Sequence, residues 1–238
     1  MDTKEFYENE YLEKGLNAQR RYPNEELCRF MGRNFFNKDI THKQRKEIKI
    51  LEIGCGSCAN LWMLAKEGFD VYGCDLSENA IILGQEILKK YNVNASITSC
   101  NMLATSYSGE SFDVIVDVFS SYCLCRSDYI LLLKEIKRIL KPSGLFFSYF
   151  PSKRSDTFIR STPENRYDED TLNGINDIKS PYYGNKYLYR FMSCEDVRLL
   201  LSDAGFDIGY IETVGRTYHS GSEYFEWIVF EARLCKKQ

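Results

Sequence analysis

A short loop that contains two glycines is the segment of this sequence best suited to hold a ligand. The loop, Gly54-Cys-Gly56-Ser-Cys-Ala59, follows an apolar stretch and precedes a helix-like stretch. Glycine lets a ligand approach the backbone because no Cβ atom intervenes. The first turn of the helix that follows presents free N–H groups, which favour a carboxylate or a phosphate. The loop therefore predicts a binding site for a ligand that carries such a group.

A single carboxylate, Asp75, stands about twenty residues further on, at the end of the next apolar stretch. A carboxylate in that place accepts hydrogen bonds from both hydroxyls of a ribose. Gly54, Gly56 and Ala59 also match the G-x-G-x-x-A pattern of dinucleotide-binding folds. The loop and Asp75 together predict a ligand that contains a nucleoside.

Alternating strand-like and helix-like segments would position these residues. The alternation predicts a parallel sheet with right-handed crossovers, and the last two strands predict an antiparallel hairpin. The expected fold is α/β: a Rossmann-like, doubly wound, mostly parallel seven-stranded sheet. Strands are predicted at 48–53, 69–74, 93–99, 112–118, 145–150, 206–214 and 224–234. Helices are predicted at 3–19, 24–37, 57–67, 77–91, 129–140 and 193–204, with a polar linker at 41–49.

The composition of the 238-residue chain is that of an ordinary globular protein. Its formal net charge of -3 disfavours a nucleic-acid partner. Because no apolar run has the length of a membrane span and the N-terminus does not resemble a signal peptide, we expect a cytoplasmic protein without a membrane partner. The nine cysteines include a CxxC at Cys55 and Cys58, but no second CxxC or histidine pair completes a zinc site, so no metal is expected.

Five stretches of the sequence resemble the class I S-adenosylmethionine (SAM)-dependent methyltransferases. They follow one another between about residues 45 and 235, in the order and at the spacing of that family. The stretches are LEIGCGSCAN, VYGCDLSENAI, SCNMLATSYSGESFDVIVDVFS, LKPSGLFF and YRFMSCEDVRLLLSDAGF. The resemblance implies a methyltransferase domain over residues 45–238, with SAM as cofactor and S-adenosylhomocysteine as product.

The resemblance also implies how the first part of this domain contacts SAM. Glu52, Gly54 and Gly56 would line the methionine moiety. Asp75 would hold the ribose, and Leu76 would pack on the adenine.

Five further positions complete the implied cofactor site. Asn101 and Met102 stand where the family often has Asp and an apolar residue, and an amide oxygen at 101 can still accept a hydrogen bond from the adenine amino group. Asp117 and Phe119 follow the fourth strand, where the family borders the sulfonium and the acceptor. Tyr11, on the first helix, is implied to cover the pocket, so residues 1–44 are expected to be N-terminal helices over the cofactor site.

Residues 151–190 interrupt the α/β alternation with prolines, tyrosines and charges of both signs. So long an aperiodic segment in a compact domain is usually functional, and we predict an inserted lid over the acceptor. Arg154, Tyr182 and Tyr183 are the candidate acceptor-binding side chains, since Arg and Tyr suit an anionic or sugar-like molecule. The alternative is that the basic residues balance the Asp and Glu of the same segment.

His219 is the candidate general base. It follows the sixth predicted strand, and ligands bind at the carboxyl edge of open α/β sheets, where that strand ends. A neutral imidazole there could take a proton from a hydroxyl or an amine. His42 precedes the first strand and so belongs to the opposite edge. A solvated loop histidine is the alternative for His219.

The reaction expected is direct, in-line transfer of a methyl group to oxygen or nitrogen of a small molecule. Two other classes share part of the pattern: a nicotinamide-dependent oxidoreductase, with the same glycines and Asp75, and a non-catalytic, SAM-binding regulatory protein. The sequence does not identify the acceptor, the atom methylated or the oligomeric state.

Overall fold

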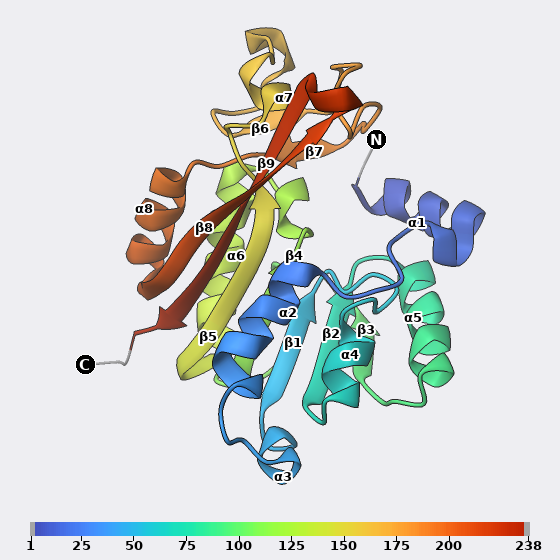
Figure 1. Ribbon diagram of the computed structural model, residues 1–238, viewed down its shortest axis with the longest axis vertical. Helices are drawn as coiled ribbons and strands as arrows, with labels where there is room; N and C mark the ends of the chain where they lie inside the picture. The colour runs from blue at the N-terminus through green and yellow to red at the C-terminus, as the bar shows by residue number, and fades with distance from the viewer. Residues whose placement is uncertain (1–2, 236–238) are drawn as a thin grey trace.

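One seven-stranded sheet forms the centre of the computed structural model, which describes residues 3–235 (Figure 1). The strand order is β3-β2-β1-β4-β5-β9-β8, and β9 runs antiparallel to both of its neighbours. The expected mostly parallel α/β sheet with a C-terminal antiparallel hairpin is therefore confirmed. The strands are β1 (Lys49–Ile53), β2 (Asp70–Asp75), β3 (Ser96–Ser99), β4 (Phe112–Val118), β5 (Leu140–Pro151), β8 (Phe206–Tyr218) and β9 (Glu223–Leu234).

Helices cover both faces of the sheet (Figure 1). α6 and α8 pack on one face, and α2, α4 and α5 pack on the other. Ile50 and Leu51 of β1 belong to opposite cores because successive side chains of a strand point to opposite faces. The helices are α1 (Thr3–Lys14), α2 (Glu25–Met31), α3 (His42–Arg45), α4 (Leu61–Lys66), α5 (Glu78–Lys90), α6 (Arg126–Ile139), α7 (Asp156–Ile159) and α8 (Cys194–Ala204).

Local sequence signals set several of the helix ends. The Ser77 side chain accepts a hydrogen bond from the backbone of Ala80 and caps α5. Ser193 and Asp196 form a capping box at the start of α8, and Gly205 ends that helix with a left-handed φ of 89°. Both helices therefore begin where the sequence predicts.

The helix after the glycine loop is shorter than predicted. α4 begins at Leu61, whereas the sequence favours a start at Ser57. Gly54, Gly56 and Cys58 have φ angles of 65°, 50° and 65°, which an α-helix cannot contain. The loop therefore continues for several residues before the helix starts.

Among the other boundaries that differ from the prediction, two do so because strand pairing or capping is stronger than the local pattern. α6 ends at Ile139, since Leu140 already pairs with Phe112 of β4. The expected linker at 41–49 contains α3, which a capping box of Thr41 and Gln44 begins.

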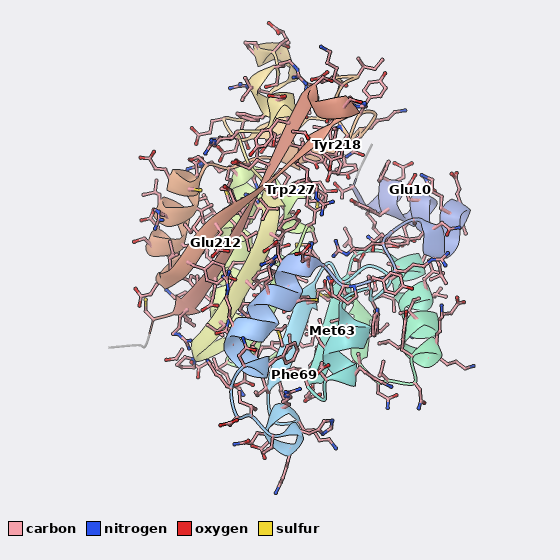
Figure 2. All side chains as sticks on the ribbon, in the orientation of Figure 1. Glu10, Met63, Phe69, Glu212, Tyr218 and Trp227 are labelled. Carbon is pink, nitrogen blue, oxygen red and sulfur yellow. The ribbon has the colours of Figure 1, made fainter. Side chains whose placement is uncertain are left out.

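The hairpin strand β8 continues to Tyr218, four residues beyond its predicted end at 214. Its last residues stay in the sheet because Gly215–Tyr218 pair in register with β9, so that the turn spans only residues 219–222. Tyr218 and Trp227 mark the end of β8 and the middle of β9 (Figure 2).

The inserted segment 151–190 is folded and contributes to the core. It contains α7, a short helical turn at Pro163–Asn165 and a two-stranded ribbon of β6 (Thr171–Asn173) and β7 (Leu188–Arg190). Alternate residues along and beside β7, Tyr187, Tyr189 and Phe191, are buried, so one face of the ribbon packs into the main core. The segment stands beyond the carboxyl ends of the parallel strands (Figure 1).

Across residues 3–235, no helix is both long enough and apolar enough to cross a membrane.

Candidate active site

The carboxylate of Asp75 is tied to the glycine loop. Its Oδ2 accepts a hydrogen bond from the Gly56 amide at 2.8 Å, and its Oδ1 accepts one from the Ser77 amide at 2.9 Å. Burial raises the pKa of Asp75, although these backbone hydrogen bonds partly oppose the rise. The carboxylate is thus held in a fixed orientation with lone pairs left for a ligand.

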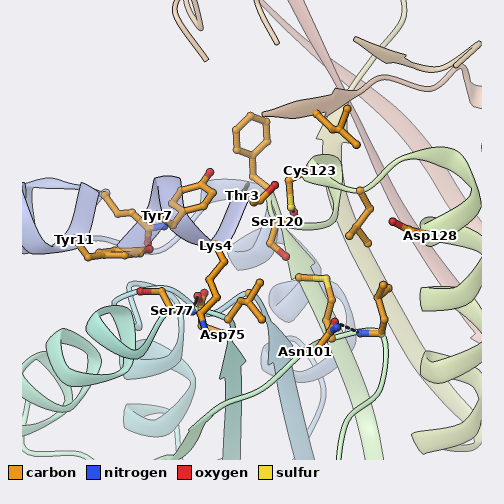
Figure 3. Close-up of a pocket in the computed structure, with 18 residues that line it drawn as sticks. Thr3, Lys4, Tyr7, Tyr11, Asp75, Ser77, Asn101, Ser120, Cys123 and Asp128 are labelled. Carbon is orange, nitrogen blue, oxygen red and sulfur yellow. Dashed lines mark hydrogen bonds between the residues drawn. The ribbon is translucent and has the colours of Figure 1, made fainter. Parts of the chain in front are cut away.

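Asp75 lines a cavity of about 300 Å³, which we call the Asp75 cavity. Tyr11, Ser77 and Asp75 lie on one side of it, and Asn101, Ser120 and Cys123 lie on the other (Figure 3). α1 contributes four lining residues and closes one side. The lining residues are Thr3, Lys4, Tyr7, Tyr11, Gln19, Gly54, Asp75, Leu76, Ser77, Asn101, Met102, Leu103, Phe119, Ser120, Cys123, Leu124, Asp128 and Leu188.

A second cavity, of about 400 Å³, surrounds Glu52 at the end of β1, and we call it the Glu52 cavity. It shares four residues with the Asp75 cavity: Tyr7, Gln19, Gly54 and Phe119. The two cavities are therefore direct neighbours, and these four residues form their shared wall. The remaining lining residues are Phe6, Glu10, Ala18, Arg20, Glu52, Cys55, Ala59, Asn60, Val118, Tyr122, Tyr182, Asn185 and Tyr187.

Two buried polar atoms beside the cavities lack a hydrogen-bond partner among the described residues. They are Oε2 of Glu52 and the hydroxyl of Tyr11. The other oxygen of Glu52 accepts a hydrogen bond from Asn60 Nδ2 at 2.5 Å. Burial raises the pKa of Glu52 to about 8, against the opposing effects of Asn60 and Arg20. An unpaired buried oxygen is costly, so this place suits a ligand that brings a hydrogen-bond donor or a cation.

Arg20 supplies the positive charge of the Glu52 cavity. Within the described part of the chain, no carboxylate lies at ion-pair distance from its guanidinium, although Glu52 interacts with it electrostatically. Its side chain reaches solvent at the mouth of the cavity, and the surrounding protein lowers its pKa. A guanidinium in this setting can bind a carboxylate through two parallel hydrogen bonds.

The turn after β4 positions Phe119 at the shared wall. Phe119 has a φ of 58°, which is strained for a bulky residue. Asp117, which is fully buried, stabilises this turn by accepting hydrogen bonds from the amides of Ser120 and Ser121 and from the Ser148 hydroxyl. Asp117 therefore supports the cavity from behind and does not line it.

Most of the predicted cofactor residues come together at these cavities. Gly56 lies directly behind the lining, next to Tyr11 and Gln19. Asn101 is present at the wall, but its Oδ1 already accepts a hydrogen bond from the Leu103 amide at 2.9 Å (Figure 3). The predicted residues that line a cavity are Tyr11, Glu52, Gly54, Asp75, Leu76, Asn101, Met102 and Phe119.

The predicted acceptor and base residues are brought together only in part. Tyr182 lines the Glu52 cavity, and its ring lies 5.5 Å from that of Phe119. Arg154 and Tyr183 are exposed, with 77% of the Arg154 side chain accessible, and they lie outside both linings. His219 follows β8 at the expected edge, but it is exposed and also lies outside both linings, because β8 carries the turn beyond the cavities.

The sequence interpretation does not identify Gln19, Arg20 or Tyr122 as lining residues, whereas Tyr187 is one of the tyrosines of the predicted lid. Gln19 is the last residue of the predicted helix 3–19 and Arg20 follows it, but both lie between α1 and α2 in the structure. Tyr122 and Tyr187 are 65 residues apart and meet through their hydroxyls at 2.6 Å. Only the tertiary packing brings these residues to the site.

Known proteins resemble this chain in sequence. The methyltransferase domain family matches residues 50–144. A protein of Bacillus subtilis (strain 168) named as a methyltransferase, YqeM, is 31% identical over 79% of this chain and 85% of its own length. The chain belongs to the SAM-dependent methyltransferase family. SAM is accordingly the cofactor of this methyltransferase.

More distant relatives agree with this assignment. A ubiquinone biosynthesis O-methyltransferase of Sinorhizobium fredii is 27% identical over 52% of this chain, and a demethylmenaquinone methyltransferase of Geobacillus stearothermophilus is 30% identical over 46%. The chain spans about half the length of each of these two relatives, 54% and 49%. A solved SAM-dependent methyltransferase from Methanosarcina mazei has the same fold, with a TM-score of 0.69 at 21% identity over 84% of this chain and 99% of its own.

The residues at the two cavities fit SAM. Glu52 Oε2, which has no hydrogen-bond partner among residues 3–235, suits the ammonium group of a methionine moiety, and the guanidinium of Arg20 suits its carboxylate. The fixed carboxylate of Asp75 suits a ribose.

Proposed function

We propose that this methyltransferase transfers the methyl group to an oxygen or nitrogen atom of a small, flat acceptor in the Glu52 cavity. The observation that carries the proposal is the shared wall. On one side of it stand Asp75 and Leu76, which suit a nucleoside, and on the other stand aromatic side chains. The reacting atoms would meet between Gly54 and Phe119.

In this proposal the cofactor extends through both cavities. Asp75 accepts hydrogen bonds from the ribose, and Leu76 and Met102 pack on the adenine. Glu52 and Arg20 hold the amino and carboxylate groups of the methionine end. When bound, SAM supplies a methyl group that is already electrophilic because a sulfonium sulfur carries it. The transfer therefore needs no metal ion.

Aromatic side chains favour a flat acceptor. Phe119 lies 4.4 Å from Tyr122 and 5.5 Å from Tyr182, measured between ring centroids. Such rings pack against planar molecules and exclude water from the reacting atoms. Relatives named for ubiquinone biosynthesis and for demethylmenaquinone are in keeping with an aromatic acceptor of this kind.

A sugar-like or anionic acceptor has less support because the arginines of the insertion have partners already. Arg160 pairs with Asp177 at 2.5 Å and with Glu223 at 2.5 Å. Arg166 lies over the Phe158 ring, 4.8 Å from its centroid. These guanidinium groups have partners both inside the insertion and on β9, which leaves them less available to an acceptor.

Methyl transfer from labelled SAM to defined acceptors tests the proposal. The panel should pair each phenol or aromatic amine with its methylated counterpart, and should include a sugar, a tRNA and an unstructured peptide. We expect label on phenols or aromatic amines and none on their methylated counterparts. Label on the tRNA or the peptide alone would contradict a small acceptor, and tighter binding of NAD than of S-adenosylhomocysteine would contradict the cofactor site.

A further inference from the structure

The N-terminal helix α1 covers the Asp75 cavity but has little packing of its own. Tyr11 is its single buried residue among those described. On one side, the Glu8 carboxylate accepts hydrogen bonds from the Glu78 amide at 2.6 Å and from Asn79 Nδ2 at 2.7 Å, at the start of α5. A helix held by so few contacts opens readily unless something else fixes it.

The other side of α1 is fixed by three tyrosine hydroxyls. The Tyr7 hydroxyl lies 2.6 Å from that of Tyr122 and 3.0 Å from that of Tyr187. The third side of the triangle, between Tyr122 and Tyr187, is 2.6 Å. Tyr7 belongs to α1, Tyr122 to the turn after β4 and Tyr187 to the insertion, so this tyrosine triad joins three distant parts of the chain.

We propose that Tyr122 and Tyr187 are positioning residues for the cofactor, which retain it by holding Tyr7 and, through it, α1 over the Asp75 cavity. Neither residue belongs to the lining of that cavity, whereas Tyr7 does. Their effect on the nucleoside end of the ligand therefore passes through the helix, whereas the methionine end in the Glu52 cavity lies beside them. The inference rests on the proposed placement of the cofactor in the Asp75 cavity.

The three hydroxyls of the tyrosine triad can form a lasting contact, which we call the latch. Three hydroxyls at mutual hydrogen-bond distance can each donate to the next and accept from the previous one, which uses every proton. Burial raises the pKa of Tyr7, Tyr122 and Tyr187, the last to about 12, so all three stay protonated near neutral pH. The ring pair of Phe6 and Tyr187, with centroids 4.9 Å apart, adds an apolar contact between α1 and the insertion.

The same triad connects the cofactor helix to the acceptor side. Tyr7, Tyr122 and Tyr187 all line the Glu52 cavity, so a molecule bound there contacts the latch directly. A molecule that stabilises the triad would slow the opening of α1, whereas one that displaces Tyr187 would speed it.

The rate at which adenosine, which lacks the methionine end and so does not reach the Glu52 cavity, leaves the protein tests the inference. The substitutions Tyr122→Phe and Tyr187→Phe each remove a hydroxyl that makes two of the three hydrogen bonds and keep the ring. We expect each to raise the dissociation rate, measured by stopped-flow displacement, by about tenfold. Tyr189→Phe is the matched control, because the Tyr189 hydroxyl is buried in the same segment without a partner among the described residues.

Three results decide the matter. Faster dissociation in Tyr122→Phe and Tyr187→Phe, with the Tyr189→Phe rate unchanged, supports the latch. Equal rates in all four proteins overturn it, as does an equal increase in all three variants, which indicates general loosening. If either Tyr122→Phe or Tyr187→Phe does not fold, the dissociation rate of the other variant still tests the latch. These experiments use no acceptor, so they test the latch separately from the proposed function. If the cofactor site itself were misplaced, the Asp75→Ala variant would bind the cofactor with normal affinity.

Discussion

The Tyr11 hydroxyl lies 2.7 Å from the position that a Cβ atom on Gly56 would occupy. α1 and the glycine loop are therefore in direct contact, and Gln19 Oε1 would overlap the same Cβ atom. The absence of a side chain at Gly56 is what lets the helix cover the loop.

Gly56→Ala should accordingly displace Tyr11 and Gln19 and weaken binding of S-adenosylhomocysteine by more than about tenfold. Gly221→Ala is the matched control, since Gly221 also has a positive φ but nothing lies within 4 Å of its added Cβ. Gly221→Ala should lower the free energy of unfolding by about 1 kcal/mol and leave the affinity for S-adenosylhomocysteine unchanged. Isothermal calorimetry measures both, and equal affinities in the two variants would rule out the steric account.

Asp75→Ala should lower the affinity for SAM and S-adenosylhomocysteine by at least about tenfold, since charge-assisted hydrogen bonds contribute about 1.5–3 kcal/mol each. The substitution also frees the amides of Gly56 and Ser77, so Asp75→Asn serves as a milder variant that keeps one acceptor oxygen. Its affinity should lie between those of Asp75→Ala and the unsubstituted protein. Normal affinity in Asp75→Ala would mean that the ribose lies elsewhere.

Arg20→Ala should weaken binding of S-adenosylhomocysteine by about tenfold or more, because a bidentate hydrogen-bonded pair with its carboxylate is lost. Arg20→Lys should recover only part of the affinity, since an ammonium lacks the planar fork. The neighbouring Arg21 is exposed and bonds to Asn17 at 2.6 Å, so Arg21→Ala controls for the change in net charge. An equal loss in the Arg20 and Arg21 variants would indicate long-range electrostatics alone.

Glu52 should make the stability of the ligand-free protein depend on pH. Its pKa is raised to about 8 from an ordinary value of 4.5, so the folded state binds the proton more tightly than the unfolded chain does. The contribution of Glu52 to stability is complete below pH 4.5 and is lost as the pH rises through about 8, by up to about 1.4 kcal/mol per pH unit. Urea unfolding of Glu52→Gln between pH 5 and 9 should show a flatter profile; an unchanged slope would contradict the assignment.

The carboxyl group of Glu52 also predicts whether the protein releases or takes up a proton when its ligand binds. A ligand ammonium group favours the ionised form of Glu52, so binding at pH 7 should release a proton that Glu52→Gln does not release. Calorimetry in two buffers with different ionisation enthalpies measures this difference.

His219→Asn should change the turnover of any accepted substrate by less than about twofold. The side chain is exposed and lies outside both linings, whereas loss of a general base slows a reaction by about a hundredfold or more. Initial rates with labelled SAM measure the effect. A loss of a hundredfold would show that the turn at residues 219–222 closes over the acceptor during catalysis.

Much of the fold follows from local sequence patterns. The apolar run of β4, which only Asp113 and Asp117 interrupt, predicts a central parallel strand because both of its faces are covered. Ser77, Ser193 and Gly205 act within a few residues of their own positions, so their capping roles are visible without any tertiary information. The glycine loop and Asp75 are placed in the same way, because successive parallel strands end at one edge of the sheet.

The acceptor side of the site depends on tertiary packing. Arg20 and Tyr122 carry no periodic or motif signal, and they meet Tyr187 of the predicted lid only because the turn before α2, the turn after β4 and the insertion come together at the cavities. The strained turn at Phe119 depends in the same way on Asp117, whose partner Ser148 lies on another strand. His219 shows the converse: topology places it at the correct edge, but the length of β8 decides that its side chain faces solvent. Contacts between residues far apart in the chain depend on side-chain packing across elements, which a local pattern does not encode.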